Sequence, residues 1–509
     1  MRDSAAVADA GRRSPREVPE SGDDRSVSWV LGAVLVLGTT AVAALMVPDL
    51  RHWFLVPVTA CGLLVAPDAV DWVRGRLDVF DPQALTGLVG VHFFFVTPLL
   101  HVGFDYWAKY VDGSADWRTA LGRMALVNLL GLTVYRAVLA PRPTRAHPPL
   151  PSTDVRRLGR LSAAVAVLGA LSFALLVARM GGPAAYVEAM ADDRSQLQGL
   201  GPALLVSTAF PIALLVLALV RLRDRLRRRP AAVVLVLVPY ALLELLVGGL
   251  GGSRSHTVWC LVVGVGLCHF LVAPVRRRTL VVLTVALVGF LYLYGFYKAA
   301  GSDALEAIGE GASLSELSSD TGRDMRSVLL GDLGRADVQA LLLERQQEGR
   351  APVAHGATYL GDLTFLVPDS LGLGRIPDKI DVGTDMLYGS GSHRPDFASS
   401  YVYGLGGEAV LNFGAAGAVL AFLPFALVVR GASSYYRRCL TSPHAPGAAL
   451  VAPGLSLAAA LALTSDLDNV TWFLLNYVAV FALLALGSRV RARAGETPPA
   501  ERAAPGRAG

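Results

Sequence analysis

The chain carries few charged side chains for its length. Asp, Glu, Lys and Arg account for 17% of its 509 residues, whereas hydrophobic residues account for 53%, and the mean hydropathy is +0.48. A soluble protein of this size needs more charge to cover its surface. The composition therefore excludes a soluble globular enzyme and predicts a membrane protein.

Lysine is scarce as well. Only Lys109, Lys298 and Lys379 are lysines, so 43 of the 46 basic residues are arginine. Together with the abundant Ala, Gly and Val, this bias is typical of a GC-rich genome, and the basic pI near 9.1 is no indication of nucleic-acid binding. The positions of the arginines, and not their number, therefore indicate function.

Cysteine and metal-ligand patterns are missing too. The four cysteines lie in or beside apolar runs, which predicts no disulfide framework. No group of His, Asp or Glu has the spacing of a metal site. Asp466, Asp468 and Asn469 are too few for a full oxygen shell, although that turn is expected to line the cavity. We expect neither a metal nor another cofactor.

The chain does contain a series of long apolar runs. Runs of roughly 18 to 22 residues match the ~30 Å hydrocarbon core of a bilayer and predict an all-α, polytopic integral membrane protein with about twelve transmembrane helices. Segment 68–80 is expected to lie along the interface as an amphipathic helix, and the tails 1–26 and 489–509 are expected to be disordered. The expected spans are 28–47, 53–67, 84–104, 119–140, 161–180, 202–220, 231–250, 256–273, 279–297, 405–428, 448–464 and 470–487.

Arginine-rich connections orient these spans by the positive-inside rule. They all fall on one side, which is expected to be the cytoplasm and to hold both termini of a multi-pass protein of the cytoplasmic membrane. The large segment 298–404, before the last three spans, then lies outside, where its 16 acidic and 9 basic residues give a net charge of −7. The basic connections are 221–229, 275–278, 430–438, 489–493 and the arginines between 142 and 160.

A glycine-rich turn, GGSRSH at 251–256, places Arg254 and His256 between two spans on the outer side. Glycines allow a ligand to approach the backbone closely, and N–H groups beside a guanidinium form an anion site. The alternative is an arginine that only reaches the interface. Glu244, inside the preceding span, is expected as a counter-ion for the outward-facing arginine rather than as a catalyst.

Two blocks of the outer segment carry patterns. Residues 313–349 have the Leu and Val spacing of a helix that Gly349 would end. Residues 355–395 are rich in Gly, Pro and Asp, as expected of an ordered binding lid. The second block reads G-x-x-Y-L, then L-V-P-x-x-L and P-x-K, and G-E-A-V-L-N-F-G-x-x-G follows it into the tenth span.

With these blocks the chain resembles the oligosaccharide repeat-unit polymerases, the Wzy or O-antigen polymerase family. The likeness covers roughly 80–490, and the G-S-R at 252–254, the twelve spans and the large outer loop also fit. The matching residues of the loop blocks are Gly356, Tyr359, Leu360, Pro368, Pro377, Lys379, Gly407, Glu408, Asn412, Phe413, Gly414 and Gly417.

The resemblance implies glycosyl transfer on the outer face of the membrane. The donor would be a growing glycan on undecaprenyl pyrophosphate and the acceptor a single lipid-linked repeat unit. A chain-length regulator protein is a candidate partner, and nucleic acid is not. The lipid pyrophosphate leaving group needs positive charge as the glycosidic bond breaks, and the acceptor hydroxyl needs a general base.

Candidate residues follow from these two requirements. Forked guanidinium groups suit pyrophosphate, whereas carboxylates and histidines suit the base, for which His256 is a further candidate. For Arg323 and Arg326 the alternative is an exposed helix face, and for Glu408 it is a structural cap at the start of the tenth span. The candidates are Glu408, Asp396 and His393 for the base, and Arg254, Arg394, Arg194, His256, Lys379, Arg323 and Arg326 for pyrophosphate or glycan binding.

Two other functions remain open on the sequence. A ligase that moves a finished glycan to another acceptor would share the arginines and the outer loop. A transporter or flippase for lipid-linked sugars should show internal repeats and helices broken within the membrane, and the sequence shows neither feature.

Overall fold

The computed structural model describes residues 22–140, 148–191, 200–249, 254–300, 309, 311–350, 352–364, 376–394, 397 and 401–490. Of the candidates, Arg194 and Asp396 lie outside these residues, as does the side chain of Arg254. The described residues form helices with two isolated β-bridges and no strand, which confirms the all-α fold.

Eleven helical stretches of the described chain are long and apolar enough to cross a bilayer, and each matches an expected span. The twelfth expected span is α10 (Arg254–Leu271), whose apolar part, His256–Leu271, is shorter. The eleven are α1 (Gly22–Met46), α2 (Leu55–Arg74), α3 (Pro82–Val91) continued by α4 (Thr97–Phe104), α5 (Trp117–Leu139), α6 (Val155–Arg179), α8 (Gly201–Arg228), α9 (Val234–Glu244) with its flanking turns, α11 (Arg277–Ala300), α17 (Gly404–Leu440), α18 (Pro446–Thr464), and α19 (Leu467–Leu474) continued by α20 (Val480–Gly487).

Several of these helices expose large apolar side chains. Met46 on α1 is 78% exposed, Leu175 on α6 72% and Leu235 on α9 76%. A soluble protein rarely leaves so much apolar surface in water, whereas a bilayer covers it. The exposed faces and the span lengths together indicate a multi-pass membrane protein.

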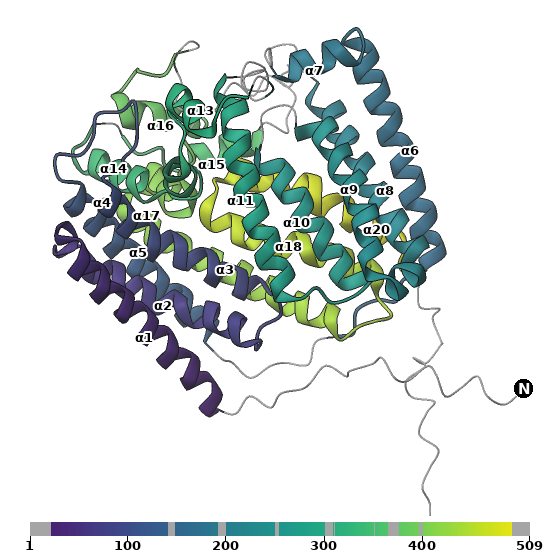
Figure 1. The fold of residues 1–509 in the computed structure, drawn as a ribbon, viewed down its shortest axis with the longest axis horizontal. Helices are drawn as coiled ribbons and strands as arrows, with labels where there is room; N and C mark the ends of the chain where they lie inside the picture. The colour runs from purple at the N-terminus through teal and green to yellow at the C-terminus, as the bar shows by residue number, and fades with distance from the viewer. Residues whose placement is uncertain are drawn as a thin grey trace, which may run out of the picture.

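The helices form two groups (Figure 1). One group packs α1 to α5 around a core that also includes α14 (Ala336–Gln347) and α17. The other packs α6, α8, α9, α10, α18 and α20 around a second core. Because α17 packs on both α5 and α18, and α18 packs on α10, these two helices join the groups.

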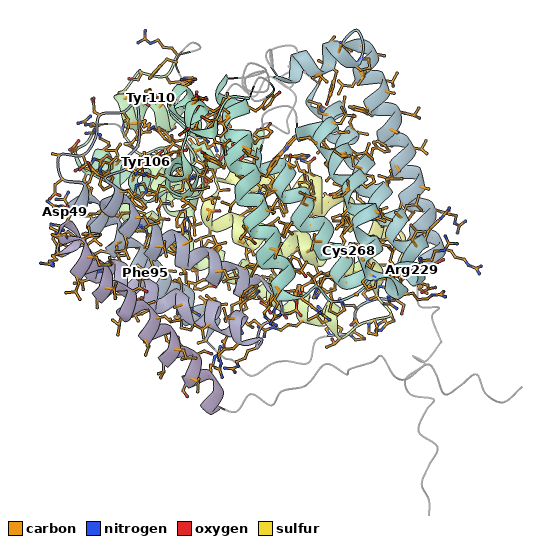
Figure 2. The ribbon with its side chains drawn as sticks, in the orientation of Figure 1. Asp49, Phe95, Tyr106, Tyr110, Arg229 and Cys268 are labelled. Atoms are coloured by element: carbon orange, nitrogen blue, oxygen red, sulfur yellow. The ribbon has the colours of Figure 1, made fainter. Side chains whose placement is uncertain are left out.

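The bundle has two different ends. The loop end carries α13 (Leu314–Thr321), α14, α15 (Ala357–Thr364) and α16 (Lys379–Tyr388). The opposite end, which we call the arginine end, carries the basic connections. Figure 2 shows Tyr106 and Tyr110 at the loop end and Arg229 at the arginine end.

Many arginines at the arginine end hold helix termini together. Arg223 donates to the carbonyl of Leu271 at 2.9 Å, and Arg277 donates to the carbonyls of Trp72 and Leu77 at 2.7 and 2.8 Å. Cations are favourable at the carboxyl ends of helices, where carbonyls lack partners. These arginines therefore stabilise the fold at the same end that the positive-inside rule assigns to the cytoplasm.

Two expectations about local structure are wrong. Residues 68–74 continue α2 rather than forming an interfacial helix, and Asp78 beyond them contacts His269 at 3.2 Å. The 313–349 stretch is not one helix, because Gly322 adopts a φ of +63° and ends α13. A π-helical segment, Ser327–Asp332, follows before α14, which does end just before Gly349.

Candidate functional site

A buried polar cluster lies at the loop end, where α15, α16, α17 and the α18–α19 turn meet. We call it the acidic cluster, and it consists of Asp362, Lys379, Glu408, Asp466 and Asp468. Lys379 donates to Asp466 at 2.6 Å and to Asp468 at 2.8 Å. Asp362, Lys379, Glu408 and Asp466 are each 5% exposed or less. Two carboxylates therefore hold the ammonium group, and the cluster is buried except at Asp468, whose side chain is 33% exposed.

Two of these carboxylates cap each other's helices. Asp466 accepts from the N–H groups of Tyr403 and Gly404, at 2.8 and 2.7 Å, and so caps the start of α17. Glu408, one turn into α17, accepts from the N–H of Leu467 at 2.8 Å at the start of α19. Glu408 thus does cap a helix. The alternative had expected a cap on its own span, α17, whereas the helix that Glu408 caps is α19.

A break in α17 anchors the loop beside this cluster. Gly414 has φ +66° and ψ −161°, a conformation that only glycine adopts readily. In the preceding turn, the carbonyls of Leu411 and Asn412 accept from the N–H groups of Ala354 and His355, both at 2.9 Å. A broken helix was expected of a transporter. Here loop backbone occupies these carbonyls, so the break holds the loop rather than opening a path.

Asn412 aligns α15 with α17. Its amide donates to the Thr358 hydroxyl at 2.6 Å, and its carbonyl oxygen accepts from the Thr358 N–H at 3.3 Å. Asp362 follows Thr358 by one helical turn, just as Asn412 follows Glu408. The two polar pairs face each other on adjacent helices, and this brings Asp362 to Glu408.

The carboxyl groups of Asp362 and Glu408 face each other within reach of a hydrogen bond. Such a bond requires one proton between two acids. Burial, together with the charge of Asp468, raises the pKa of Asp362 to about 6 against the opposing effects of Glu408 and Lys379. One oxygen of each acid, Asp362 Oδ2 and Glu408 Oε1, has no conventional donor within the described part of the chain. The pair can therefore take up or release a proton near neutral pH.

Lys379 organises the cluster. Burial disfavours its charged form, but Asp466 and Asp468 outweigh that effect and raise the pKa of the ammonium group. Its charge is thus fully engaged by two carboxylates. This arrangement favours a role in holding α16 against the α18–α19 turn over the expected binding of pyrophosphate or glycan, which stays a prediction.

His393 lies beside two carboxylates of α16. Its Nδ1 is 3.0 Å from Asp381 Oδ1, and its backbone N–H donates to Asp385 at 2.9 Å. The ring is half-buried, and a carboxylate orients it. Such a pairing suits a histidine that transfers protons, and the role expected for His393 stays a prediction.

The outer arginines have different surroundings. Arg323 is paired with Asp332 at 2.7 Å, and Arg326 lies 3.9 Å from Asp324 and over the ring of Phe104. These contacts favour the structural alternative for both. Arg394 has an exposed side chain, and its backbone exchanges two hydrogen bonds with that of Phe397. An exposed guanidinium is available to an anionic substrate.

His256 lies in a second polar group among the helices. Its Nε2 is 3.0 Å from Glu244, and its Nδ1 lies 3.0 Å from the hydroxyl of Tyr477. Within the described residues Glu244 contacts His256, and the expected pairing of Glu244 with an arginine stays a prediction, because the side chain of Arg254 lies outside them. Both ring nitrogens of His256 are engaged, which favours a structural role over the expected substrate contact or base. Tyr477 follows Asp468 of the acidic cluster by nine residues, so the two polar groups are separated by roughly 14 Å along the helix.

Asp362 was not among the site residues predicted from the sequence. The signal was present, because Thr358 and Asp362 are four residues apart on one helical face, as are Glu408 and Asn412. Within the described residues, no group of three or more His, Cys, Asp or Glu side chains is arranged to hold a metal ion. Comparison of the chain with protein-family models, curated proteins and solved structures gives no match.

Proposed function

We propose that the protein is a membrane glycosyltransferase that polymerises undecaprenyl-pyrophosphate-linked oligosaccharide repeat units on the outer face of the cytoplasmic membrane. The observation that carries the proposal is the buried Asp362–Glu408 pair. The two acids can share a proton and so act as a base, and they lie where a segment of about a hundred residues packs against the helix bundle. The resemblance of the 355–417 blocks to the polymerase family supports the same activity.

In the proposed reaction, the acceptor hydroxyl attacks the anomeric carbon of the donor glycan. A new C–O bond forms as the bond from that carbon to the lipid pyrophosphate breaks, and the pyrophosphate leaves with the electron pair. The hydroxyl proton passes to the Asp362–Glu408 pair. The surrounding carboxylates also favour positive charge that develops on the sugar as the leaving group departs.

The leaving group cannot be held by the same cluster. With four acids and one lysine, the cluster is net negative even when one proton is shared, so it repels a diphosphate. The exposed Arg394 is the best-supported anion ligand among the described residues, and Arg254, at the start of α10, is the second candidate. Separate positive and negative regions suit a donor with an anionic leaving group and a neutral sugar.

The test is substitution followed by analysis of glycan length in the producing cells. Glu408→Gln and Asp362→Asn keep the side-chain shapes but remove the base, so both should abolish long chains and accumulate single lipid-linked repeat units. Asp320→Asn changes an exposed acid of the same loop and serves as the control. Normal chain-length ladders in Glu408→Gln, at equal membrane abundance, would assign Glu408 to capping alone.

The pyrophosphate role is tested separately. Arg394→Ala should leave the protein inserted and folded but strand single repeat units on the lipid carrier. Arg350→Ala, at another exposed arginine of the loop, should leave the ladder unchanged. A wild-type ladder in Arg394→Ala would contradict its contact with the leaving group while leaving the base assignment intact.

A further inference from the structure

A cavity of about 210 Å³ opens at the arginine end, away from the acidic cluster. Its walls come from α17, α18, α20 and the segment 148–153. Most of the lining is apolar, including Val451, Leu455 and Ala485. If a methylene group occupies about as much space as a water molecule, ~30 Å³, the cavity holds roughly seven methylene groups, or about half of an acyl chain.

The walls of the cavity are fixed by hydrogen bonds. Thr153 and Arg489 form an antiparallel bridge, and the N–H of Val490 donates to the carbonyl of Ser152 at 2.9 Å. The Thr153 hydroxyl accepts from the N–H of Gly447 at 3.0 Å. The cavity therefore exists without a ligand and needs no rearrangement to accept one.

Positive charge surrounds the mouth of the cavity. Arg489 lines it directly, and the charges of both Arg489 and Arg438 act on the hydroxyl of Tyr435 in its wall. Arg438 also donates to the carbonyl of Pro148 at 2.6 Å. One acid, Asp154, lies nearby. It caps α6 by accepting from the N–H of Arg157, and the two arginines outnumber it.

We propose that this cavity binds one acyl chain of an anionic phospholipid, whose phosphate group lies against Arg489 and Arg438. An apolar slot between helices with arginines at its mouth matches both parts of such a lipid. Basic pockets of this kind at a helix-bundle end recognise anionic headgroups. The site is independent of the proposed function, because it lies at the other end of the bundle and uses different residues.

The experiment measures lipid binding by native mass spectrometry of the purified full-length protein. Phosphatidylglycerol and phosphatidylcholine with identical acyl chains are titrated separately, and oleate is titrated as the free fatty acid. The wild type should bind phosphatidylglycerol more tightly than phosphatidylcholine. Removing each arginine should weaken phosphatidylglycerol binding about fivefold. The double variant Arg489→Gln/Arg438→Gln should therefore lose most of the preference and keep its affinity for phosphatidylcholine.

Two further variants separate the chain from the headgroup. Ala482→Phe and Ala448→Phe each fill the cavity from a half-buried position, and both should weaken both phospholipids. Arg229→Gln removes an exposed arginine at the same end and should change nothing (Figure 2). Equal affinity for the two phospholipids, an unchanged preference in the double arginine variant, or tighter binding of oleate than of phosphatidylglycerol would each overturn the assignment.

Discussion

Replacing Lys379 with methionine tests the organisation of the acidic cluster. Methionine keeps much of the length and apolar character of the lysine stem but removes the charge. At 2.6 and 2.8 Å, the contacts with Asp466 and Asp468 are each worth about 6 kcal/mol of gross Coulomb attraction at an effective dielectric constant of 20. Burying Lys379 and Asp466 opposes this gain, whereas Asp468 stays 33% exposed. Deleting one partner of a buried pair therefore costs about 3–5 kcal/mol net, because the remaining carboxylates are stranded.

The assay is thermal unfolding of the purified protein in detergent. The expected loss corresponds to a fall in Tm of roughly 3–5 °C for a chain of this size. Arg350→Met is the matched control, since its pair with Glu348 is 2.8 Å long but more than a third exposed on both sides, and such pairs contribute about 0–1 kcal/mol. Adding Asp468→Asn to Lys379→Met should recover part of the loss. Equal Tm values for Lys379→Met and Arg350→Met would refute a buried ion pair at this site.

Alkaline pH supplies a second test of the same prediction. The pKa of Lys379 is raised above its ordinary value of 10.5 in the folded protein. Its stabilising contribution is therefore complete below pH 10.5 and is lost as the pH rises through the folded pKa. The Tm difference between the wild type and Lys379→Met should be constant up to about pH 10 and narrow above it. A constant difference at higher pH would contradict the raised pKa.

Three further outcomes are expected. Gly131→Ala should destabilise the protein by about 1–3 kcal/mol or more in thermal unfolding, since the new Cβ would lie 2.2 Å from Phe422. The control Gly289→Ala places its Cβ in open space and should leave the stability unchanged. Equal Tm values for the two variants would contradict the α5–α17 contact. Gly414→Ala should lower the free energy of unfolding by about 1–3 kcal/mol through backbone strain. It should also loosen the 354–355 segment, which faster hydrogen exchange at the amides of Ala354 and His355 would report. Unchanged exchange would contradict the anchoring role of the α17 break. For Asp362, whose pKa rises from 3.8 to about 6, the free energy of unfolding should fall by about 2 kcal/mol between pH 4 and pH 6, out of about 3 kcal/mol over the whole titration. Asp362→Asn should lack this fall, and identical pH profiles would refute it.

Much of the candidate site could be named from the sequence, but its partnerships could not. Glu408 and Lys379 were both predicted as functional residues, and the structure brings them into one cluster. Asp362, which completes the proposed base, lies 46 residues from Glu408, and Asp466 lies 87 residues from Lys379. No local pattern joins residues so far apart without a knowledge of which helices pack together. For the same reason, the sequence did not predict that His256 contacts both Glu244 and Tyr477.

The sequence by itself determined the class of protein and the positions of its spans. That information is local, because the length of each apolar run is set by the thickness of the hydrocarbon core and by the need to satisfy every backbone group within one helix. The tertiary structure alone decided which buried charges meet. Burial requires each carboxylate to find a donor, and α15, α16, α17 and α19 supply those donors only once they are packed together.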